Sequence, residues 1–437
     1  MTAIRRLYVH CTSALSSLGP SDGLTHPAWL PERALAAAVP GDLVCLPRPV
    51  DVDHLTFLNL LGVGPAPDDV LVPDGLAASD GGDSTLATRV CADRSLVERI
   101  LRAVPPGGVL ELHAGASTPD VLALARWLER EGATRVRVLG GSPADSERAD
   151  QKHVVRAKAI ELGVPVAPGE VVELPFAGGR RRRDFDVMRA AIERQLRLTG
   201  RVLVRGSVAA GRCSSFVVSD SGGGHPDEVI YHVSAGADNR VYLIEAMVDP
   251  IVSPTIHLHI ERSGTVSRGA ATDRRSGRPP QGVDLFPSSA HLLGAMEQWA
   301  HTMASWIGSE GYVGDLGLDF VEYRDEGTGE PAAFLARVNP RIKGAGYSLA
   351  LRNRLNDERR GRDLPPIEAF ASAPLTARLR SFGDLADALG VLLFSHEEGR
   401  GIVPCATGLV ALAPTTREAL ALQAEARAAL EDTCAVG

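Results

Sequence analysis

A carboxylate and a carboxamide in the second half of the chain are spaced so that they could share one metal ion. Asp319 lies in GDLGLDFVEY, which reads as a strand, and Asn339 lies in FLARVNPR, a second strand after the turn RDEGTGEP. Because side chains alternate between the two faces of a strand, pairing of these strands would bring Asp319 and Asn339 to one point. Carboxylate and amide oxygens suit Mg²⁺, which takes its remaining ligands from water and substrate phosphates.

Basic residues follow this pair closely. Arg341 and Lys343 come directly after Asn339, where they could meet an anion. The same alternation predicts that Leu335, Arg337 and Asn339 share one face, and that Glu322 points away from the face of Asp319. Taken singly, Asp319 is better interpreted as a strand-end carboxylate and Asn-Pro as an ordinary turn. The ordered set suggests a site for a metal ion and an anion.

Composition excludes several other classes of protein. The 437 residues predict two or three domains, and the net charge of −8 argues against a nucleic-acid partner. Six scattered cysteines without a CxxC pair disfavour a zinc site or a disulfide framework. No apolar run is long enough for a membrane helix, and no apolar segment follows Arg5 and Arg6 as in a signal peptide, so we expect no membrane association and a cytoplasmic protein.

The first third of the chain predicts a parallel α/β domain. Short apolar runs near Gly or Pro predict strands at 7–11, 43–46, 109–112 and 136–139, and helical spacing predicts a helix at 118–130. This order makes a βαβ unit with a right-handed crossover. No GxGxxG follows a strand, so we expect a structural Rossmann-like domain and disfavour an NAD-dependent oxidoreductase.

After a polar, turn-rich boundary at 142–150, the pattern changes to α+β. A helix is predicted at 152–162. Further strands are predicted at 202–205, 229–233, 242–245, 255–261, 317–323 and 333–338. Further helices are predicted at 184–197, 289–307, 384–389 and 416–430. The charged segments 272–284 and 356–366 read as surface loops, or as lids over a polyanionic ligand.

The ordered motifs resemble those of the ATP-grasp superfamily, which includes D-alanine ligase, biotin carboxylase and glutathione synthetase. Besides the Asp319 and Asn339 segments, QKHVVRAKAIELGVPVAPG resembles the entry helix of that family, RVLVRGSVAAGRCSS resembles its triphosphate loop, and VYLIEAMVDP resembles its adenine linker. The resemblance implies that Lys152 and Arg205 bind phosphates and that Glu245 accepts from the adenine amine. It also implies backbone contacts to the nucleotide from Gly206, Ser207, Ser214, Ser215, Ala246, Met247 and Val248.

The resemblance also implies an architecture. We expect a preceding αβ domain at residues 1–145, a first ATP-grasp subdomain at 146–250 that carries the nucleotide lid and adenine linker, and a second subdomain at 251–437 that carries the metal and substrate site. The segments DLVCLPRPVDVDHLTFLNLLG and EGRGIVPCATGLVALAPTTREALAL, together with RVNPR, further resemble the pheganomycin-type peptide ligases of natural-product pathways.

The activity implied by the resemblance is that of an ATP- and Mg²⁺-dependent carboxylate–amine ligase acting through an acyl phosphate on an amino acid or short peptide. Arg341 would hold the acyl donor and stabilise the oxyanion, with help from Lys343, and Asp319 and Asn339 would bind Mg²⁺. His257 and His259, which share one strand face, are candidate bases. A homodimer is compatible with the sequence.

One central position departs from the family pattern. The residue two before the motif asparagine is normally a Glu that bridges two Mg²⁺ ions, and here it is Arg337, which cannot bind a metal. Three outcomes follow for an active enzyme: only one Mg²⁺ is held, another carboxylate (Glu322, Asp315 or Glu261) substitutes, or Arg337 itself binds phosphate. A non-catalytic ATP-binding protein is the alternative.

Overall fold

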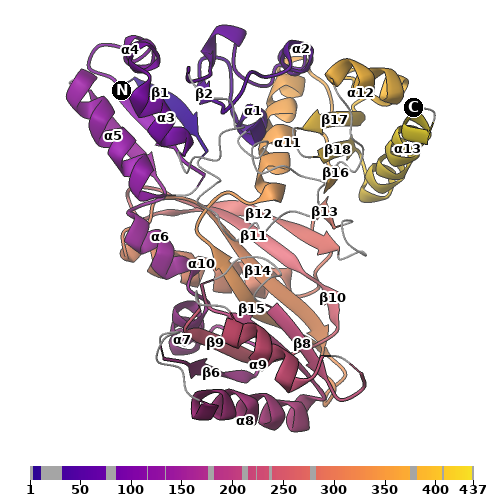
Figure 1. Ribbon diagram of the computed structural model, residues 1–437. Coiled ribbons are helices and arrows are strands. Elements are labelled where there is room, and N and C mark those ends of the chain that lie inside the picture. The colour runs from indigo at the N-terminus through magenta and orange to yellow at the C-terminus, as the bar shows by residue number, and fades with distance from the viewer. Residues whose placement is uncertain are drawn as a thin grey trace.

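The computed structural model contains three β-sheets that follow one another along the chain (Figure 1). It describes residues 3–10, 32–74, 85–115, 117–132, 134–175, 182–208, 215–222, 224–235, 239–275, 282–374, 381–405 and 408–435. The mixture of a parallel N-terminal sheet with two mainly antiparallel sheets confirms the expected fold class. No helix of these residues is both long and apolar enough to cross a membrane.

The first sheet is parallel, in the order β3-β2-β1-β4-β5. Its strands are β1 (Ile4–Val9), β2 (Leu43–Cys45), β3 (Val70–Leu71), β4 (Val109–His113) and β5 (Arg135–Leu139). Its helices include α3 (Leu86–Ala92), α4 (Arg94–Arg102) and α5 (Pro119–Gly132). The predicted unit of strand, helix and strand is therefore confirmed as β4-α5-β5. The predicted first strand starts three residues earlier, at Ile4, and its Cys11 end lies outside the described residues.

The second, small sheet is antiparallel, in the order β6-β9-β7-β8. It consists of β6 (Gly169–Glu173), β7 (Arg201–Gly206), β8 (Ser215–Ser219) and β9 (Val241–Ala246). The helices α8 (Arg182–Thr199) and α9 (Pro226–Ala235) pack against one face, at the bottom of Figure 1. The opposite face of this sheet is thereby left to face the rest of the molecule.

The strand predicted at 229–233 is wrong, because this segment belongs to helix α9. Val229 and Val233 are both 2% exposed and pack into the core beneath the small sheet. Their spacing of four residues places them on one side of a helix. The β-branched composition favoured a strand, but burial of this helical face determines the conformation.

The third, large sheet carries nine strands, and helix α10 (Leu293–Ser309) covers one of its faces. Its strands are β10 (Pro250–Val252), β11 (Pro254–Ile260), β12 (Val266–Arg275), β13 (Val283–Phe286), β14 (Gly314–Arg324), β15 (Pro331–Asn339), β16 (Ala369–Pro374), β17 (Gly401–Cys405) and β18 (Gly408–Ala413). Leu318 and Phe320 of β14 point towards α10, and Asp319 between them points to the uncovered face.

Two segments expected to be irregular are helical. The boundary at 142–150 contains α6 (Pro143–Asp150), which begins at a capping box formed by Ser142 and Asp145. The predicted helix at 152 is confirmed as α7 (Lys152–Glu161). The first half of the predicted loop at 356–366 belongs to α11 (Gly344–Gly361), because Leu355 and Arg359 are buried on its inner side.

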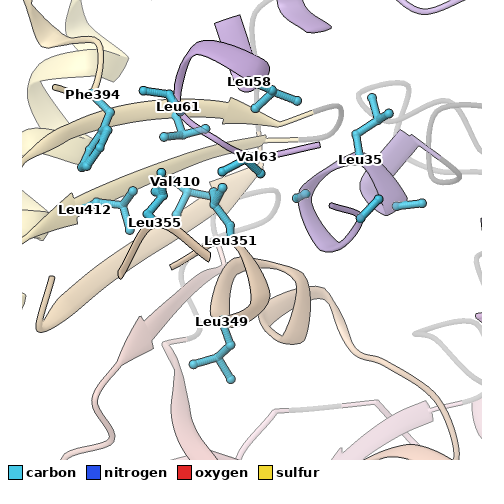
Figure 2. Packing of buried hydrophobic residues seen from close by; sticks show 14 of the residues in the cluster. Leu35, Leu58, Leu61, Val63, Leu349, Leu351, Leu355, Phe394, Val410 and Leu412 are labelled. Atoms are coloured by element: carbon cyan, nitrogen blue, oxygen red, sulfur yellow. The ribbon is translucent and has the colours of Figure 1, made fainter. Parts of the chain in front are cut away.

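The C-terminal part of the chain packs back onto the N-terminal part (Figure 2), in a core that also includes Tyr8 of β1 and Val44 of β2. Leu35 of α1 (Ala34–Ala37) and Leu58 of α2 (Val52–Leu60) share one apolar core with Leu355 of α11 and Leu412 of β18. Two further helices, α12 (Phe382–Leu389) and α13 (Thr416–Ala435), complete this end of the molecule. The parallel sheet and the large sheet are therefore held together by a common core.

Candidate active site

The predicted metal ligands Asp319 and Asn339 lie side by side on the uncovered face of the large sheet. In the β14–β15 ladder, Asn339 is opposite Gly317 and Arg337 is opposite Asp319. Asn339 Nδ2 donates to Asp319 Oδ2 at 2.9 Å. The two strands thus bring the carboxylate and the carboxamide together, as the alternation predicts.

A β-bulge between Asp319 and Phe320 corrects one detail of that alternation. Arg337 is opposite Asp319, but the next pair is Phe320 with Leu335, so Ala336 is the extra residue. Leu335 therefore faces the α10 core with Phe320, and the prediction that it shares the face of Arg337 and Asn339 is wrong. Arg337 and Asn339 lie before the bulge, in regular register, and share the face of Asp319.

The carboxylate of Asp319 is surrounded by donors. Thr255 Oγ1 donates to Asp319 Oδ1 at 2.6 Å, and Lys343 Nζ donates to the same oxygen and to Thr255 Oγ1 at 3.1 Å. Burial alone raises the pKa of Asp319, but the Lys343 ammonium and the hydrogen bonds from Thr255 and Asn339 bring its pKa below the ordinary value. Asp319 is thus held as an anion that is already paired with a cation.

Asp150, at the end of α6, joins the two arginines of the motif. Arg337 Nη2 donates to Asp150 Oδ1 at 3.2 Å, and Arg341 Nη1 lies 3.7 Å from the same oxygen. All three side chains are largely buried, with exposed fractions between 16% and 26%. No sequence pattern indicated this carboxylate, apart from its place two residues before Lys152.

Lys152, a predicted phosphate ligand, lies at the first residue of α7. Its Nζ donates to the carbonyl oxygens of Gly206 at 2.9 Å and Ser207 at 3.2 Å, at the end of β7. Burial, together with the positive charges of Arg337 and Arg205, lowers the pKa of Lys152 to about 7. This ammonium therefore lies in a place where an added negative charge would stabilise it.

Arg205 and Glu245, on the face of the small sheet that α8 and α9 leave uncovered, form a buried ion pair. Arg205 Nε donates to Glu245 Oε2 at 3.0 Å, and Arg205 Nη1 donates to the carbonyl oxygen of Ala336 at 3.1 Å. Arg156 Nη1 donates to the other carboxylate oxygen, Glu245 Oε1, at 3.0 Å. Both oxygens of Glu245 are thus engaged by guanidinium groups, and the predicted contact to an adenine amine stays a prediction.

The remaining predicted nucleotide contacts are placed as follows. Ser207 is fully buried, and its hydroxyl group bonds to His153 Nδ1 at 2.6 Å. Ser215 begins β8 opposite Arg205, and Ser214 lies outside the described residues. Ala246, Met247 and Val248 end β9 and follow it, and the Met247 N–H donates to the Arg201 carbonyl at 3.0 Å. The structure brings Gly206 and Ser207 to Lys152 and leaves their roles as predictions.

The whole cluster carries an excess of positive charge. Six basic side chains gather here with three acidic ones, namely Lys152, Arg156, Arg205, Arg337, Arg341 and Lys343 with Asp150, Asp319 and Glu245. Such a site suits a polyanion such as a triphosphate better than a bare divalent cation.

The oxygen donors fit one magnesium ion. Asp319 and Asn339 supply a carboxylate and an amide oxygen, which suit Mg²⁺ together with phosphate oxygens and water. The described residues contain no group of three or more His, Cys, Asp and Glu side chains that could hold a metal by themselves. Arg337, directly opposite Asp319, opposes a second ion electrostatically.

None of the three substitute carboxylates considered from the sequence lies beside Asp319. Glu322 is fully buried on the α10 side, where it accepts from His291 Nδ1 at 2.7 Å and the Leu292 N–H at 2.8 Å. Asp315 bonds to His259, four residues along the strand from Asp319. Glu261 follows the end of β11. None of these carboxylates therefore takes the place of the missing Glu beside Asp319 in this structure.

A cavity of about 960 Å³ adjoins the cluster. It lies between the parallel sheet, β11 and β14 of the large sheet, and α11. Arg341 lines it, as do side chains that local sequence patterns did not indicate: Tyr8, His10, Glu111, His113, Tyr347 and Arg354. By contrast, the space between the small sheet and β15, lined by Lys152, Arg205, Glu245 and Arg337, is about 10 Å³, the room of one water molecule.

The two candidate histidines differ in their surroundings, although both line this cavity. His257 Nε2 bonds to Thr272 Oγ1 at 2.9 Å, and burial and the nearby Lys343 ammonium lower its pKa to about 4. His259 Nδ1 bonds to Asp315 Oδ1 at 2.9 Å, and this hydrogen bond raises its pKa above the ordinary value.

Comparison with known proteins identifies the fold. Residues 31–129 match the Pre ATP-grasp domain. The chain is similar to an N5-carboxyaminoimidazole ribonucleotide synthetase solved as an ADP complex, at 12% identity and a TM-score of 0.54 over 98% of this chain and 96% of that one. It is also similar to the N5-carboxyaminoimidazole synthase of Aspergillus clavatus in complex with ADP and 5-aminoimidazole ribonucleotide, at 13% identity and a TM-score of 0.52 over 99% and 100%.

A third similar structure is glycinamide-RNase-transformylase T from Mycobacterium tuberculosis, at 17% identity and a TM-score of 0.50 over 98% of this chain and 100% of that one. These similarities extend over nearly the whole chain, and the family match lies within the parallel sheet region that precedes the basic cluster. The chain therefore has the ATP-grasp fold, with a Pre ATP-grasp domain at residues 31–129.

Proposed function

We propose that this protein is an ATP-dependent carboxylate–amine ligase that activates its carboxylate substrate as an acyl phosphate. The position of Asp150 carries this proposal. Its carboxylate pairs with Arg337 on the side of Lys152 and Arg205, and it approaches Arg341 at the wall of the 960 Å³ cavity. A triphosphate among the basic residues would thus adjoin a chamber large enough for two small substrates.

The chemistry has two steps. A carboxylate oxygen attacks the γ-phosphorus of ATP, the bond to the β-phosphate oxygen breaks, and ADP leaves. An amine then attacks the acyl carbon, the bond from carbon to the phosphate oxygen breaks, and inorganic phosphate leaves with the electron pair. Positioning and neutralisation of charge supply most of the catalysis in such transfers.

In this scheme Lys152 and Arg205 bind phosphate oxygens, and Arg341 holds the acyl donor and stabilises the oxyanion of the tetrahedral intermediate. Arg337 occupies the position that is normally a Glu in ATP-grasp motifs, and here it neutralises phosphate charge. Asp319 and Asn339 would hold one Mg²⁺, which neutralises phosphate charge when bound. Lys343, now paired with Asp319, would then be available to the anion.

Entry of ATP requires a rearrangement of the cleft. The side chains of Arg205, Arg156 and Glu245 fill the space between the small sheet and β15. We propose that residues 146–250 move as one nucleotide-binding unit against residues 251–437, with residues 1–145 as the preceding domain. The three separate sheets support this division.

For the substrates we propose an amino acid or a short peptide, joined as in the pheganomycin-type peptide ligases of natural-product biosynthesis. The support is the resemblance of the sequence segments and the polar lining of the cavity, which offers both arginines and carboxylates to a zwitterion. The cytoplasmic location and a homodimer remain predictions from the sequence.

The competing proposal is a non-catalytic ATP-binding protein, and Arg337 at the metal position is the observation in its favour. The test incubates the purified protein with ATP, Mg²⁺ and a pool of amino acids and dipeptides, followed by mass spectrometry for a condensed product. Substrate-dependent release of ADP and phosphate with a new amide product supports the ligase. Tight ATP binding without turnover across the pool supports the alternative.

A further inference from the structure

The cavity beside the basic cluster contains a histidine–carboxylate pair that the scheme above does not use. His259 of β11 and Asp315 of β14 are direct partners in the antiparallel ladder, and His259 Nδ1 lies 2.9 Å from Asp315 Oδ1. Their side chains are 31% and 45% exposed, and both line the cavity. Both side chains are therefore accessible from the cavity.

The hydrogen bond determines which ring nitrogen can accept a proton. An ionised carboxylate only accepts, so the hydrogen in this bond belongs to His259 Nδ1. In the neutral ring, Nε2 then carries the lone pair. Within the described part of the chain, Nε2 has no hydrogen-bond partner, so this lone pair is available to a molecule in the cavity.

Two of the other three histidines of the cavity, His10 and His257, are less suited to take up a proton. Burial lowers the pKa of His10 to about 3, and burial together with Lys343 lowers that of His257 to about 4. His113 forms a similar pair, in which Nε2 bonds to Glu111 at 3.0 Å and the ring packs on Tyr8, so the experiment below includes a variant of His113. The charged groups that line the cavity include Asp315, Glu261, Glu111, Arg6, Arg137, Arg262, Arg341 and Arg354, and of these the carboxylates of Asp315, Glu261 and Glu111 raise the pKa of His259.

The distance along the sheet between Asp319 and His259 leaves room for the substrates between them. The pair of Thr255 with Asp319 and the pair of His259 with Asp315 lie on the same two strands, four residues apart. At about 3.3 Å per residue this is about 13 Å, too far for a direct contact. An acyl phosphate beside Arg341, with an amine beyond it, would occupy the space between them.

We propose that His259, held by Asp315, is the general base that removes a proton from the ammonium group of the acceptor substrate. The assignment rests on the proposed ligase function and makes the acceptor a primary or secondary amine that enters the cavity from the side of the parallel sheet. One ammonium proton passes to His259 Nε2 and then to water. After the nitrogen–carbon bond has formed, a second proton leaves the nitrogen and is taken up by the departing phosphate.

Hydroxylamine separates this role from the activation of the donor. It is unprotonated at neutral pH, so it attacks an acyl phosphate without a base and forms a hydroxamate. The wild-type protein and the variant His259→Gln are each given ATP, Mg²⁺ and the amino-acid and dipeptide pool, with and without hydroxylamine. Hydroxamate formation is expected to stay within about threefold of wild type, and peptide formation to fall by about 10²- to 10⁴-fold.

A second readout is the pH profile of peptide formation. In the wild type, the rate is expected to fall as the pH decreases through the pKa of His259, which Asp315 raises. Asp315→Asn removes the negative charge that stabilises the imidazolium, so this fall should move to lower pH. His225→Gln is the matched control, because His225 and Asp227 form an exposed pair that does not line the cavity.

Three results would overturn the assignment. Equal losses of hydroxamate and peptide in His259→Gln would make the residue part of donor binding. A selective loss of peptide in His113→Gln, with none in His259→Gln, would transfer the role to the pair of His113 and Glu111. If the wild type forms neither product, the ligase proposal itself fails and this assignment fails with it.

Discussion

Arg337 lies directly opposite Asp319 in the β14–β15 ladder, and its guanidinium is paired with Asp150. The residue two before the motif asparagine is normally a Glu in ATP-grasp motifs. In this protein the same position carries a positive charge. The charge of Arg337 is balanced by Asp150, which is 187 residues away in the sequence, so the ion pair is formed by the tertiary structure. Four predictions follow from this cluster and from the buried carboxylates around it.

Replacing Arg337 by Glu is expected to impair the protein. The new carboxylate would face Asp150 and Asp319, and the local charge would fall by two units, so turnover of ATP should fall by about 10²-fold and ATP should bind more weakly. Steady-state kinetics and calorimetric ATP titrations measure both effects. Arg337→Lys, which keeps the charge, is the control. Faster turnover in Arg337→Glu, together with binding of a second Mn²⁺, would show that Arg337 is only a tolerated loss.

Binding of ATP at pH 8 is expected to take up a proton at Lys152. The pKa of Lys152 is about 7 without nucleotide, so most of this amine is neutral at pH 8. A triphosphate favours the ammonium form and raises the pKa. Because binding takes up a proton, affinity for ATP should decrease as the pH rises above about 7. Calorimetry in buffers of different ionisation enthalpy measures the uptake, and Lys152→Met should abolish it. Equal heats in all buffers for the wild type would contradict the prediction.

Glu322→Gln is expected to lower stability and leave ATP turnover unchanged. Glu322 is fully buried and accepts from His291 and the Leu292 N–H, and losing these charge-assisted bonds should cost about 1–3 kcal/mol. Burial alone raises the pKa of Glu322, but these hydrogen bonds outweigh burial, so its pKa lies below the ordinary value of 4.5. Its contribution is therefore complete above about pH 4.5 and is lost as the pH falls through the pKa of the folded protein. Urea unfolding measures the loss, and a change in Mg²⁺ dependence would instead make Glu322 a metal ligand.

Removal of Glu245 is expected to destabilise the small sheet. The carboxylate is 5% exposed and compensates Arg156 and Arg205, so Glu245→Ala leaves two buried guanidinium groups without it and should cost about 3–5 kcal/mol. Thermal unfolding and limited proteolysis measure this loss. Asp249→Asn is the control, because the ion pair of Arg201 with Asp249 is exposed and should contribute at most about 1 kcal/mol. If Glu245→Ala keeps its stability but loses preference for ATP over GTP, the residue reads adenine.

The sequence alone determined the local framework of the site. Alternation along two strands placed Asp319 and Asn339 on one face, and the helix that begins at Lys152 was recognised from its pattern. Arg337 could be identified as a departure because the motif around it is continuous in sequence. These features depend on periodicity and on near neighbours, and both can be read from a short segment.

The tertiary structure decided how these side chains are paired. Only folding brings Asp150 to Arg337 and Arg341, Glu245 to two arginines, and Asp315 to His259. Residues 229–233 are helical because burial of an apolar face outweighed local propensity. The bulge at Ala336 places Leu335 on the face opposite to the one that simple alternation predicts. Long-range ion pairs and the cavity between separate sheets depend on which surfaces meet, and local sequence patterns do not encode that meeting.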